Sequence, residues 1–458
     1  MKTPMRFIPE HKSRPLSGPW KVVLLWLAAG IPAANAQQVL APPPAVSATP
    51  SAVQQQQDSN PMQVFSPSET GPNFSSFTSP FQWGPVTVRP HVDYQFLYGN
   101  GVNSSPGQQQ NTIVQQVSPG VLFDLGSHWT LDYTPTLNFY SSSSFRNTVD
   151  HSVQLGWGTG YGDWFFSGSQ SCGFSSDPTV EIAAQTDQQT YSTALNAVYQ
   201  INSKLSLDLG LGQNFNYIGN TQGSTNQLQN LSNSREWSTM DWLNYHFRPR
   251  LSVGVGVGAG YVNEDAGPDS INEQYQGQLN WRATDKISFQ LSGGLQDQQY
   301  LSGGAGDLLT PIFSASIQYQ PFAQTYLTVG ASRTVGTSYF ENQVTENTGI
   351  NADLSQRLLG KLYLDLNGGY GITKYVSTAS LSDQIGYGAG RNDDTYSFSA
   401  RLTYPLFKRG TISVFYQYSK NSSSQTGFVQ FYPTDYVLSQ SAFAYTSSQI
   451  GFEIGYRY

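Results

Sequence analysis

Asp353, Asp365 and Arg401 are charged residues whose spacing could bring them together. The dipeptide Leu359-Gly360 reads as a tight turn, and the two aspartates lie almost equally far from it on either side. If both flanks are strands, these carboxylates approach each other across one hairpin, and Arg401 sits at a similar height above its own predicted turn. Charges of both signs at one level of a pore wall create a transverse field that selects solutes. A salt-linked wall without selectivity is the alternative interpretation.

The remaining candidates for chemistry are weak. After residue 36 the chain has four histidines, and none has a metal-ligand spacing to another or to the single cysteine, Cys172. The run Gly254 to Gly260 alternates with apolar residues and so predicts a strand, which offers no helix N-terminus for a phosphate. Its glycines are expected to face inward, where they relieve crowding or make room for a loop. There is no Gly-x-Ser-x-Gly motif, and residues as common as Ser, His and Asp do not by themselves indicate a triad. We expect the protein not to be an enzyme and to hold no metal or cofactor.

The elements that must position these residues are strands. From Trp83 onward, apolar and polar residues alternate with a period of two, as in a half-buried strand. Each predicted strand has about 13 residues, which at ~3.3 Å per residue and a tilt near 40° covers roughly 33 Å. That length exceeds the apolar band of an outer-membrane barrel, about 25 Å tall. The clearest runs are 86–98, 129–139, 204–212, 287–295, 362–366 and 412–418.

The connections between these strands fall into two classes. Longer polar segments are expected at 100–111, 175–188, 216–234, 376–392 and 419–444. Eight short turns are expected near 126–128, 160–162, 202–204, 248–250, 284–286, 321–323, 359–360 and 408–410. Eight hairpins plus a first and a last strand give about eighteen strands. The strands near Gly156 and Trp237 are the weakest, and Asp241 is out of phase unless the strand has a bulge.

Aromatic residues gather where these strands end, as barrel girdles do. Near the short turns lie Trp129, Trp164, Trp281, Phe322, Tyr404 and Phe407. Near the long segments lie Tyr98, Tyr261, Tyr300, Tyr339, Tyr375 and Tyr418. We predict an all-β fold: a transmembrane antiparallel up-and-down β-barrel with short periplasmic turns and longer extracellular loops.

The last ten residues carry the strongest signal for closure. Ile450, Phe452, Ile454, Tyr456 and Tyr458 fall on one face, with glycines and charged residues on the other. A barrel needs a last strand that pairs with its first and removes the open edge. An alternating strand that ends in an aromatic residue resembles the assembly signal of bacterial outer-membrane β-barrel proteins. The resemblance implies that Phe452, Ile454, Tyr456 and Tyr458 are read by the barrel-assembly machinery.

Composition excludes other classes. Residues 37–458 carry 18 Lys/Arg and 29 Asp/Glu, a net charge of −11, which excludes a general nucleic-acid binder. No later stretch approaches 18 apolar residues, so a helical membrane protein is excluded as well. Only 12% of residues are charged whereas 14% are aromatic, which suits strands with one lipid-facing and one lumen-facing side.

The N-terminus predicts export from the cytoplasm. A basic segment precedes an apolar run at 22–31, and Ala34-Asn35-Ala36 forms a cleavage site, so residues 1–36 are a predicted signal peptide. An uncleaved anchor helix is the alternative. Residues 37–82, rich in Pro, Gln and Ser, are expected to be a disordered periplasmic linker, or a segment that enters the lumen or meets a partner. The barrel is expected to span 83–458.

A second resemblance comes from the first two predicted strands. The segment Thr87–Gly99 (TVRPHVDYQFLYG), followed by Ser118-Pro119-Gly120, resembles the start of the putative β-barrel porin 2 family. That resemblance implies a link to exopolysaccharide export and to polysaccharide or export components as partners. The leading hypothesis is a passive channel in the bacterial outer membrane. A closed structural or adhesive barrel that binds a partner through its loops is the second hypothesis, and an outer-membrane hydrolase is the third.

Overall fold

A computed structural model of the chain describes residues 81–458, apart from 106, 180, 222–230, 303–305, 341, 379–389, 425–427, 430–435 and 438–442. The predicted signal peptide (1–36) and nearly all of the predicted linker (37–82) lie outside the described residues. Within the described part, no helix is long and apolar enough to cross a membrane.

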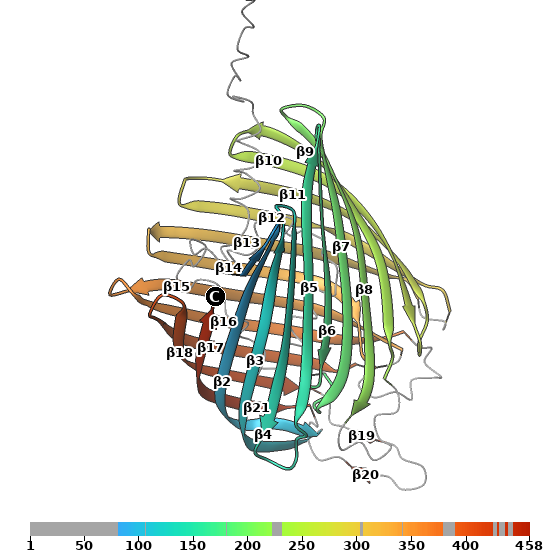
Figure 1. Ribbon diagram of the computed structural model, residues 1–458. Helices are drawn as coiled ribbons and strands as arrows, with labels where there is room; N and C mark the ends of the chain where they lie inside the picture. Colours follow the sequence, from blue (N-terminus) through green and yellow to red (C-terminus); the bar gives the residue numbers. More distant parts are fainter. Residues whose placement is uncertain are drawn as a thin grey trace, which may run out of the picture.

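The described chain forms a closed antiparallel barrel of eighteen strands (Figure 1). Each strand pairs with the next along the chain, and the last pairs with the first. The strands are β2 (Val86–Ser105), β3 (Gln108–Leu125), β4 (Trp129–Tyr140), β5 (Thr148–Tyr161), β6 (Trp164–Ser175), β7 (Thr186–Gln200), β8 (Leu205–Thr221), β9 (Ser234–Arg248), β10 (Leu251–Glu264), β11 (Ser270–Arg282), β12 (Ile287–Tyr300), β13 (Leu308–Phe322), β14 (Thr325–Thr337), β15 (Gln343–Leu358), β16 (Leu362–Ser377), β17 (Asn392–Leu406), β18 (Gly410–Ser423) and β21 (Tyr445–Arg457).

Three short strands lie outside the ring. β1 (Phe81–Trp83) folds back on the start of β2, so that Trp83 pairs with Val86. β19 (Phe428–Val429) and β20 (Tyr436–Val437) form a separate ribbon between β18 and β21.

The predicted architecture is confirmed. All eight short turns are present and lie at one end of the barrel, which is the periplasmic end by the barrel rule. The weakly patterned segments near Gly156 and Trp237 are strands β5 and β9. One expected loop is wrong: β2 and β3 run through most of 100–111 as strands and leave only residues 106 and 107 between them. There Gly107 adopts a φ of 74°, which a turn this short requires.

Asp241 needs no bulge to be accommodated. Asp208 pairs with Trp242 and Leu211 pairs with Thr239, so the register of β8 against β9 is the same on both sides of the aspartate. Asp241 therefore keeps its position on the outer face, and its Oδ1 accepts a hydrogen bond from the backbone N–H of Gly210 at 3.2 Å.

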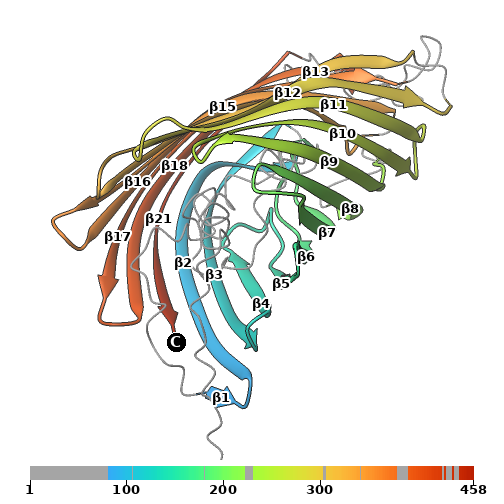
Figure 2. The ribbon, with the colours of Figure 1, turned by 90° about the horizontal axis from the view of Figure 1, so that it is seen from above.

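The period of two places apolar residues outside and polar residues inside, and the two ends of the chain show this most clearly. In the seam between β2 and β21, Tyr94 pairs with Ile454 and Phe96 with Phe452 on the outer face. Asp93 pairs with Gly455 and Gln95 with Glu453 on the inner face. The predicted role of the last strand in closure is confirmed, and Figure 2 shows β21 beside β2.

The predicted aromatic girdle holds at the short turns, where Trp129, Trp281 and Phe322 are exposed on the outer face. It is partly wrong at the other end. Tyr300 and Tyr375 take inward positions, because the outward residues of their strands are odd-numbered in β12 and even-numbered in β16. Whether an aromatic residue faces the lipid or the lumen therefore depends on the alternation of its strand and not on its position near the strand end.

Candidate functional site

The barrel lumen is the candidate site, and on β11 and β12 its inner wall consists mostly of neutral amide and hydroxyl side chains. On β11 the inward positions alternate with lipid-facing Ile271, Glu273 and Tyr275. Neighbouring amides bond to each other: Gln276 Nε2 donates to Gln274 Oε1 at 2.9 Å, and Gln274 Nε2 donates to Gln296 Oε1 at 3.3 Å. The inward residues of β11 and β12 are Ser270, Asn272, Gln274, Gln276, Gln278, Asn280, Arg282, Ser288, Gln290, Ser292, Gly294, Gln296, Gln298 and Tyr300.

Access of water to this wall changes along the barrel axis. On β15 the inward residues Gln343, Thr345 and Asn347, near the long-loop mouth, are buried. Farther down the same strand, Asn351 and Arg357 are exposed on the same face. β11, β12, β13 and β16 repeat this change, with buried inward residues near the long-loop mouth and half-exposed ones near the short turns. The strands β9, β18 and β21 differ, because their inward residues stay buried down to Asn244, Ser413 and Glu453 near the short turns. Within the described residues the lumen is therefore closed at the extracellular mouth, and a vestibule opens toward the periplasm along the wall from β11 to β16.

The predicted charge cluster lies on this inner wall, but in an arrangement that differs in detail from the expectation. Asp365 pairs directly with Arg401 on the neighbouring strand. Asp353 pairs with Asn367, whose amide donates to its Oδ1, and Asn351 Nδ2 donates to its Oδ2 at 2.9 Å. Asp353 and Asp365 are thus two residues out of register, because Asp365 pairs with Ser355, rather than opposite each other. Whether these charges select ions stays a prediction.

Arg401 has a second acidic partner that the sequence pattern did not reveal. Its Nη1 lies 3.0 Å from Glu453 Oε2, and both side chains are almost fully buried. The guanidinium passes over the ring of Phe415, with 5.3 Å between Cζ and the ring centroid. This ion pair spans β17, β18 and β21 and joins the last strand to the wall. The alternation of the last strand predicts that Glu453 faces inward. It does not predict that Glu453 contacts Arg401, which lies 52 residues earlier in the chain.

The segment between β6 and β7 (residues 176–185) closes the extracellular mouth. Its described residues from Asp177 to Gln185 are buried. The carboxylate of Glu181 accepts hydrogen bonds from Ser338 Oγ at 2.5 Å and from the backbone N–H of Tyr339 at 2.9 Å. Ser338 and Tyr339 follow β14, which lies eight strands from β6 around a ring of eighteen. The segment therefore reaches from one wall to the nearly opposite wall.

Arg391, which precedes β17, reinforces this attachment. The side chain is fully buried and stacks between two rings, 4.1 Å from the centroid of Tyr375 and 3.8 Å from that of Phe443. It pairs with Asp393 at 2.6 Å and donates from Nη1 to the backbone carbonyl of Glu181 at 3.3 Å. Burial raises the pKa of the Glu181 carboxyl above its ordinary value, against the opposing effects of the Ser338 hydrogen bond and the Arg391 charge. We call Glu181, Ser338, Arg391 and Asp393 the mouth latch.

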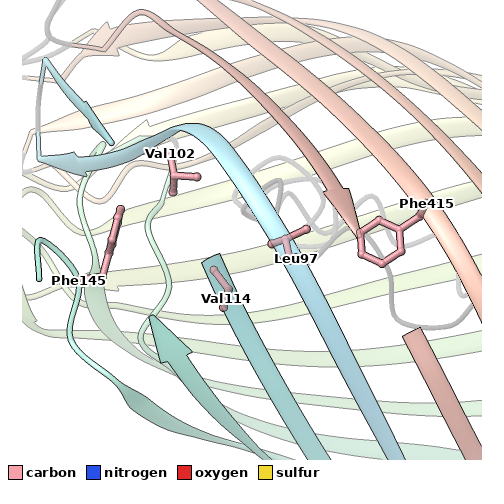
Figure 3. Close-up of a cluster of buried hydrophobic side chains, with 5 residues drawn as sticks. All are labelled: Leu97, Val102, Val114, Phe145 and Phe415. Atoms are coloured by element: carbon pink, nitrogen blue, oxygen red, sulfur yellow. The ribbon is translucent and has the colours of Figure 1, made fainter. Parts of the chain in front are cut away.

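A second connection, between β4 and β5 (residues 141–147), also folds inward. Phe145 packs on Leu97, Val102 and Val114 against the inner face of β2 and β3, near Phe415 (Figure 3). The backbone N–H of Arg146 donates to Gln185 Oε1 at 3.0 Å, and Gln185 Nε2 donates back to the Arg146 carbonyl at 3.1 Å. The apolar cluster thus fixes one connection to the wall, and that connection in turn holds the segment that carries Glu181.

The glycine row of β10 faces inward, as predicted. A Cβ at Gly256 would lie 2.6 Å from the Trp242 ring and 2.7 Å from Met240 Cε, and a Cβ at Gly254 would lie 2.2 Å from Asn244 Oδ1. The missing side chains give room to large inward residues of β9. Relief of crowding therefore explains these glycines.

The two motifs behind the family resemblance meet as neighbouring strands. His91 on β2 pairs with Gly120 on β3, where a Cβ would lie 2.1 Å from His91 Nε2. His91 Nε2 lies 3.1 Å from Thr134 Oγ1, and that hydroxyl donates to Asp132 Oδ1 at 2.8 Å. The Asp132 carboxylate thus accepts a hydrogen bond from the Thr134 hydroxyl and not from the His91 imidazole. In an acid–base–nucleophile triad the carboxylate would bond to the imidazole, so this arrangement is not such a triad. Among the residues that the structure describes, no group of three His, Cys, Asp or Glu side chains could hold a metal ion.

Comparison with known proteins gives one family match. Residues 244–432 match the family described as Putative beta-barrel porin 2. No protein of curated function matches the sequence. The matched stretch begins near the end of β9 and reaches into the connection between β18 and β21, so it includes the vestibule wall described above.

Solved structures with a similar arrangement are outer-membrane proteins. OccAB3 of Acinetobacter baumannii has a TM-score of 0.43 at 8% identity, covering 81% of this chain and 99% of that one. OpdO of Pseudomonas aeruginosa has a TM-score of 0.41 at 10% identity, covering 81% and 97%. The outer membrane protein opdK of Pseudomonas aeruginosa has a TM-score of 0.40 at 10% identity, covering 81% and 99%.

Identities near a tenth and scores below 0.5 do not define a shared function. The closed eighteen-stranded barrel and the match over residues 244–432 make this chain a porin-like outer-membrane barrel that resembles the putative β-barrel porin 2 family.

Proposed function

We propose that the protein is an outer-membrane channel that receives solutes from the periplasm and is held shut at its extracellular mouth. The observation that carries this proposal is the change along the inner wall, from exposed polar residues such as Asn351 and Arg357 to buried ones such as Asn347. Barrels of this size enclose an aqueous lumen unless inward-folded segments fill it. Here such segments fill the extracellular end, whereas the inner wall from β11 to β16 is open to water toward the periplasm.

The wall chemistry supports a neutral, hydroxyl-rich solute such as a carbohydrate chain. Amide side chains offer donors and acceptors together, and so can exchange hydrogen bonds with sugar hydroxyls without a net charge. Two cations on the inner wall have acidic partners, Arg89 with Asp124 at 2.8 Å and Arg401 with Glu453 at 3.0 Å, which limits the field of each of these cations on an ionic solute. Inward carboxylates such as Asp208 and Asp353 give the wall an acidic balance, which disfavours anionic solutes. The link to exopolysaccharide export is a proposal that fits this wall.

Liposome swelling tests the solute class. Vesicles that contain the protein are placed in uncharged oligosaccharides of increasing length and in a charged sugar of matched size. We expect slow entry through the wild type and faster entry through Glu181→Ala, with the uncharged sugars favoured. Glu273→Ala, on the outer face of β11, is the matched control and should behave as the wild type. Equal exclusion of every sugar by both proteins would contradict the channel.

The closed mouth also favours the second candidate, a barrel that acts as a surface for a partner and passes nothing. In that case the mouth latch is a fixed part of the fold, and Glu181→Ala lowers the stability of the barrel without producing conductance. Comparison of Glu181→Ala with the control Glu273→Ala therefore distinguishes the channel from the closed binding surface.

We propose that the protein reaches the outer membrane through its last strand. Phe452, Ile454 and Tyr456 form an outward row, and the ring of Tyr458 lies 3.6 Å from Arg409 Cζ at the periplasmic rim. Deletion of Tyr458 should slow insertion into cell membranes by the assembly machinery more than it slows refolding of the purified chain in detergent. An equal effect on both would assign Tyr458 a structural role only.

A further inference from the structure

The outer face of β6 to β9 carries a patch of polar side chains within the membrane-spanning band. Gln170 pairs with Thr193 and Thr193 pairs with Gln213, all on outward positions. Asp241 lies on the outward face of the next strand, beside Val257 on β10. We call Gln170, Thr193, Gln213 and Asp241 the polar patch. Each of the four is half-buried, and the apolar residues around them, such as Leu195 and Leu211, are exposed.

The height of the patch places it in hydrocarbon. Gln170 lies seven residues from the periplasmic turn at 162–163, and Asp241 lies eight residues from the turn at 249–250. With a rise of about 2.5 Å per residue along the membrane normal, both lie roughly 18–20 Å above the turns. The outward residues of β10 over the same heights, from Leu251 to Ala259, are all apolar.

Local hydrogen bonds satisfy only part of the patch. Thr193 Oγ1 donates to Gln170 Oε1 at 2.5 Å, and Gln170 Nε2 donates to the Ser171 carbonyl at 3.3 Å. The second Gln170 Nε2 proton has a weak acceptor in the Cys172 sulfur at 3.8 Å, which an outside partner would replace. Asp241 Oδ1 accepts from Thr239 Oγ1 and from the backbone N–H of Gly210, both at 3.2 Å, which leaves its Oδ2 for an outside partner. Among the ion pairs of the described residues, none includes Asp241. A carboxylate and amides that face acyl chains without full partners cost free energy, and such residues usually face protein instead.

We propose that the polar patch is the interface of a homodimer in the membrane. A two-fold axis along the membrane normal between β7 and β8 would bring β6 of one copy against β9 of the other. Gln170 and Asp241 lie at nearly equal heights on those two strands, so each Gln170 amide would donate to the carboxylate of Asp241 in the second copy. An isologous contact makes this pair twice. The complementarity of amide donor and carboxylate acceptor selects a second copy rather than lipid.

The single cysteine of the chain offers a native probe. Cys172 pairs with Tyr191 and Val153 on outward positions, next to the polar patch. β6 lies one and a half strands from the proposed axis, so at ~4.8 Å between strands the two Cys172 sulfurs would be roughly 20 Å apart. A flexible bismaleimide of that span, applied to outer membranes that contain the full chain, should give a band of twice the mass. Cys172→Ser should abolish the band.

Two further cysteine variants test the position of the proposed two-fold axis. In the Cys172→Ser background, Thr193→Cys on β7 should form a disulfide-linked dimer with a mild oxidant, whereas Leu295→Cys on the outward face of β12 should not. Asp241→Leu with Gln213→Leu should lower bismaleimide crosslinking at Cys172 at least tenfold. Heat-dependent gel mobility reports whether the barrel of each variant is folded.

The outcomes decide the proposal. Crosslinks from Thr193→Cys and from Cys172 that depend on Asp241 support it. A monomer in all arms, with Cys172 labelled by a monofunctional maleimide, would overturn it, as would crosslinks to another protein in place of a second copy. Equal dimer yields from Thr193→Cys and Leu295→Cys would show random collision and overturn it too.

Discussion

Arg401 and Glu453 form a buried ion pair, 3.0 Å apart, that connects β17 to the last strand over the ring of Phe415. Loss of one partner leaves an uncompensated charge in a site shielded from water. We predict that Arg401→Met lowers the free energy of unfolding by about 3–5 kcal/mol. Urea unfolding of the refolded barrel measures it.

The double variant Arg401→Met/Glu453→Leu serves as the control for that measurement. Replacement of both charges by apolar groups should restore much of the stability, because a buried pair often gains little over an apolar pair. If the double variant is as unstable as the single one, the loss comes from packing on Phe415 rather than from charge.

The inner-wall charges allow a test of selectivity. Asp365 pairs in register with Arg401, and Asp353 lies on the same face of the preceding strand. Arg401→Glu adds negative charge at that level, so the reversal potential in asymmetric salt should shift toward cation preference. Asp297→Asn on the outer face of β12 is the control. An unchanged reversal potential would mean that Asp353, Asp365 and Arg401 are part of a salt-linked wall without selectivity.

The mouth latch should respond to pH. The charged groups around Glu181 are Arg391, which lowers its pKa, and Asp393, which raises it. Burial raises the pKa of Glu181 in the latched state above the value of a water-exposed carboxyl, so proton binding favours the latched state. The latched state should therefore lose stability as pH rises from the ordinary glutamate pKa through the raised one. Opening frequency in a planar bilayer should rise over the same range and become flat in Glu181→Gln.

The glycine row of β10 gives a prediction on packing. A Cβ at Gly256 would lie 2.6 Å from the Trp242 ring, so Gly256→Val should destabilise the barrel by about 1–3 kcal/mol. Gly368→Ala, on the outer face of β16 with nothing within 4 Å of the added Cβ, should change stability little. Thermal unfolding followed by gel mobility compares the two. Equal losses would mean that the contact with Trp242 does not determine the effect.

Most of the fold could be predicted from the sequence because one local rule, alternation with a period of two, applies to every strand. The count of eighteen, the eight short turns and the inward glycines of β10 all follow from it. The faces of Tyr300 and Tyr375 also follow from it, and the expectation was wrong because it used their position near strand ends instead.

The closed mouth could not be predicted in this way. Glu181 lies 157 residues from Ser338 and 210 from Arg391, and these residues meet only because the ring brings β6, β14 and β17 around one lumen. The same holds for Arg401 and Glu453. The alternation pattern gives the face of each residue but carries no information on which inward residues meet across the barrel.

Single-channel conductance in a planar bilayer tests the central claim most directly. The protein purified from outer membranes is compared with Glu181→Ala in symmetric and then asymmetric salt. We predict small or infrequent steps for the wild type, large stable steps for Glu181→Ala, and weak ion selectivity in both. A correctly folded Glu181→Ala barrel that stays silent would contradict a latched channel and leave a closed barrel that serves as a binding surface.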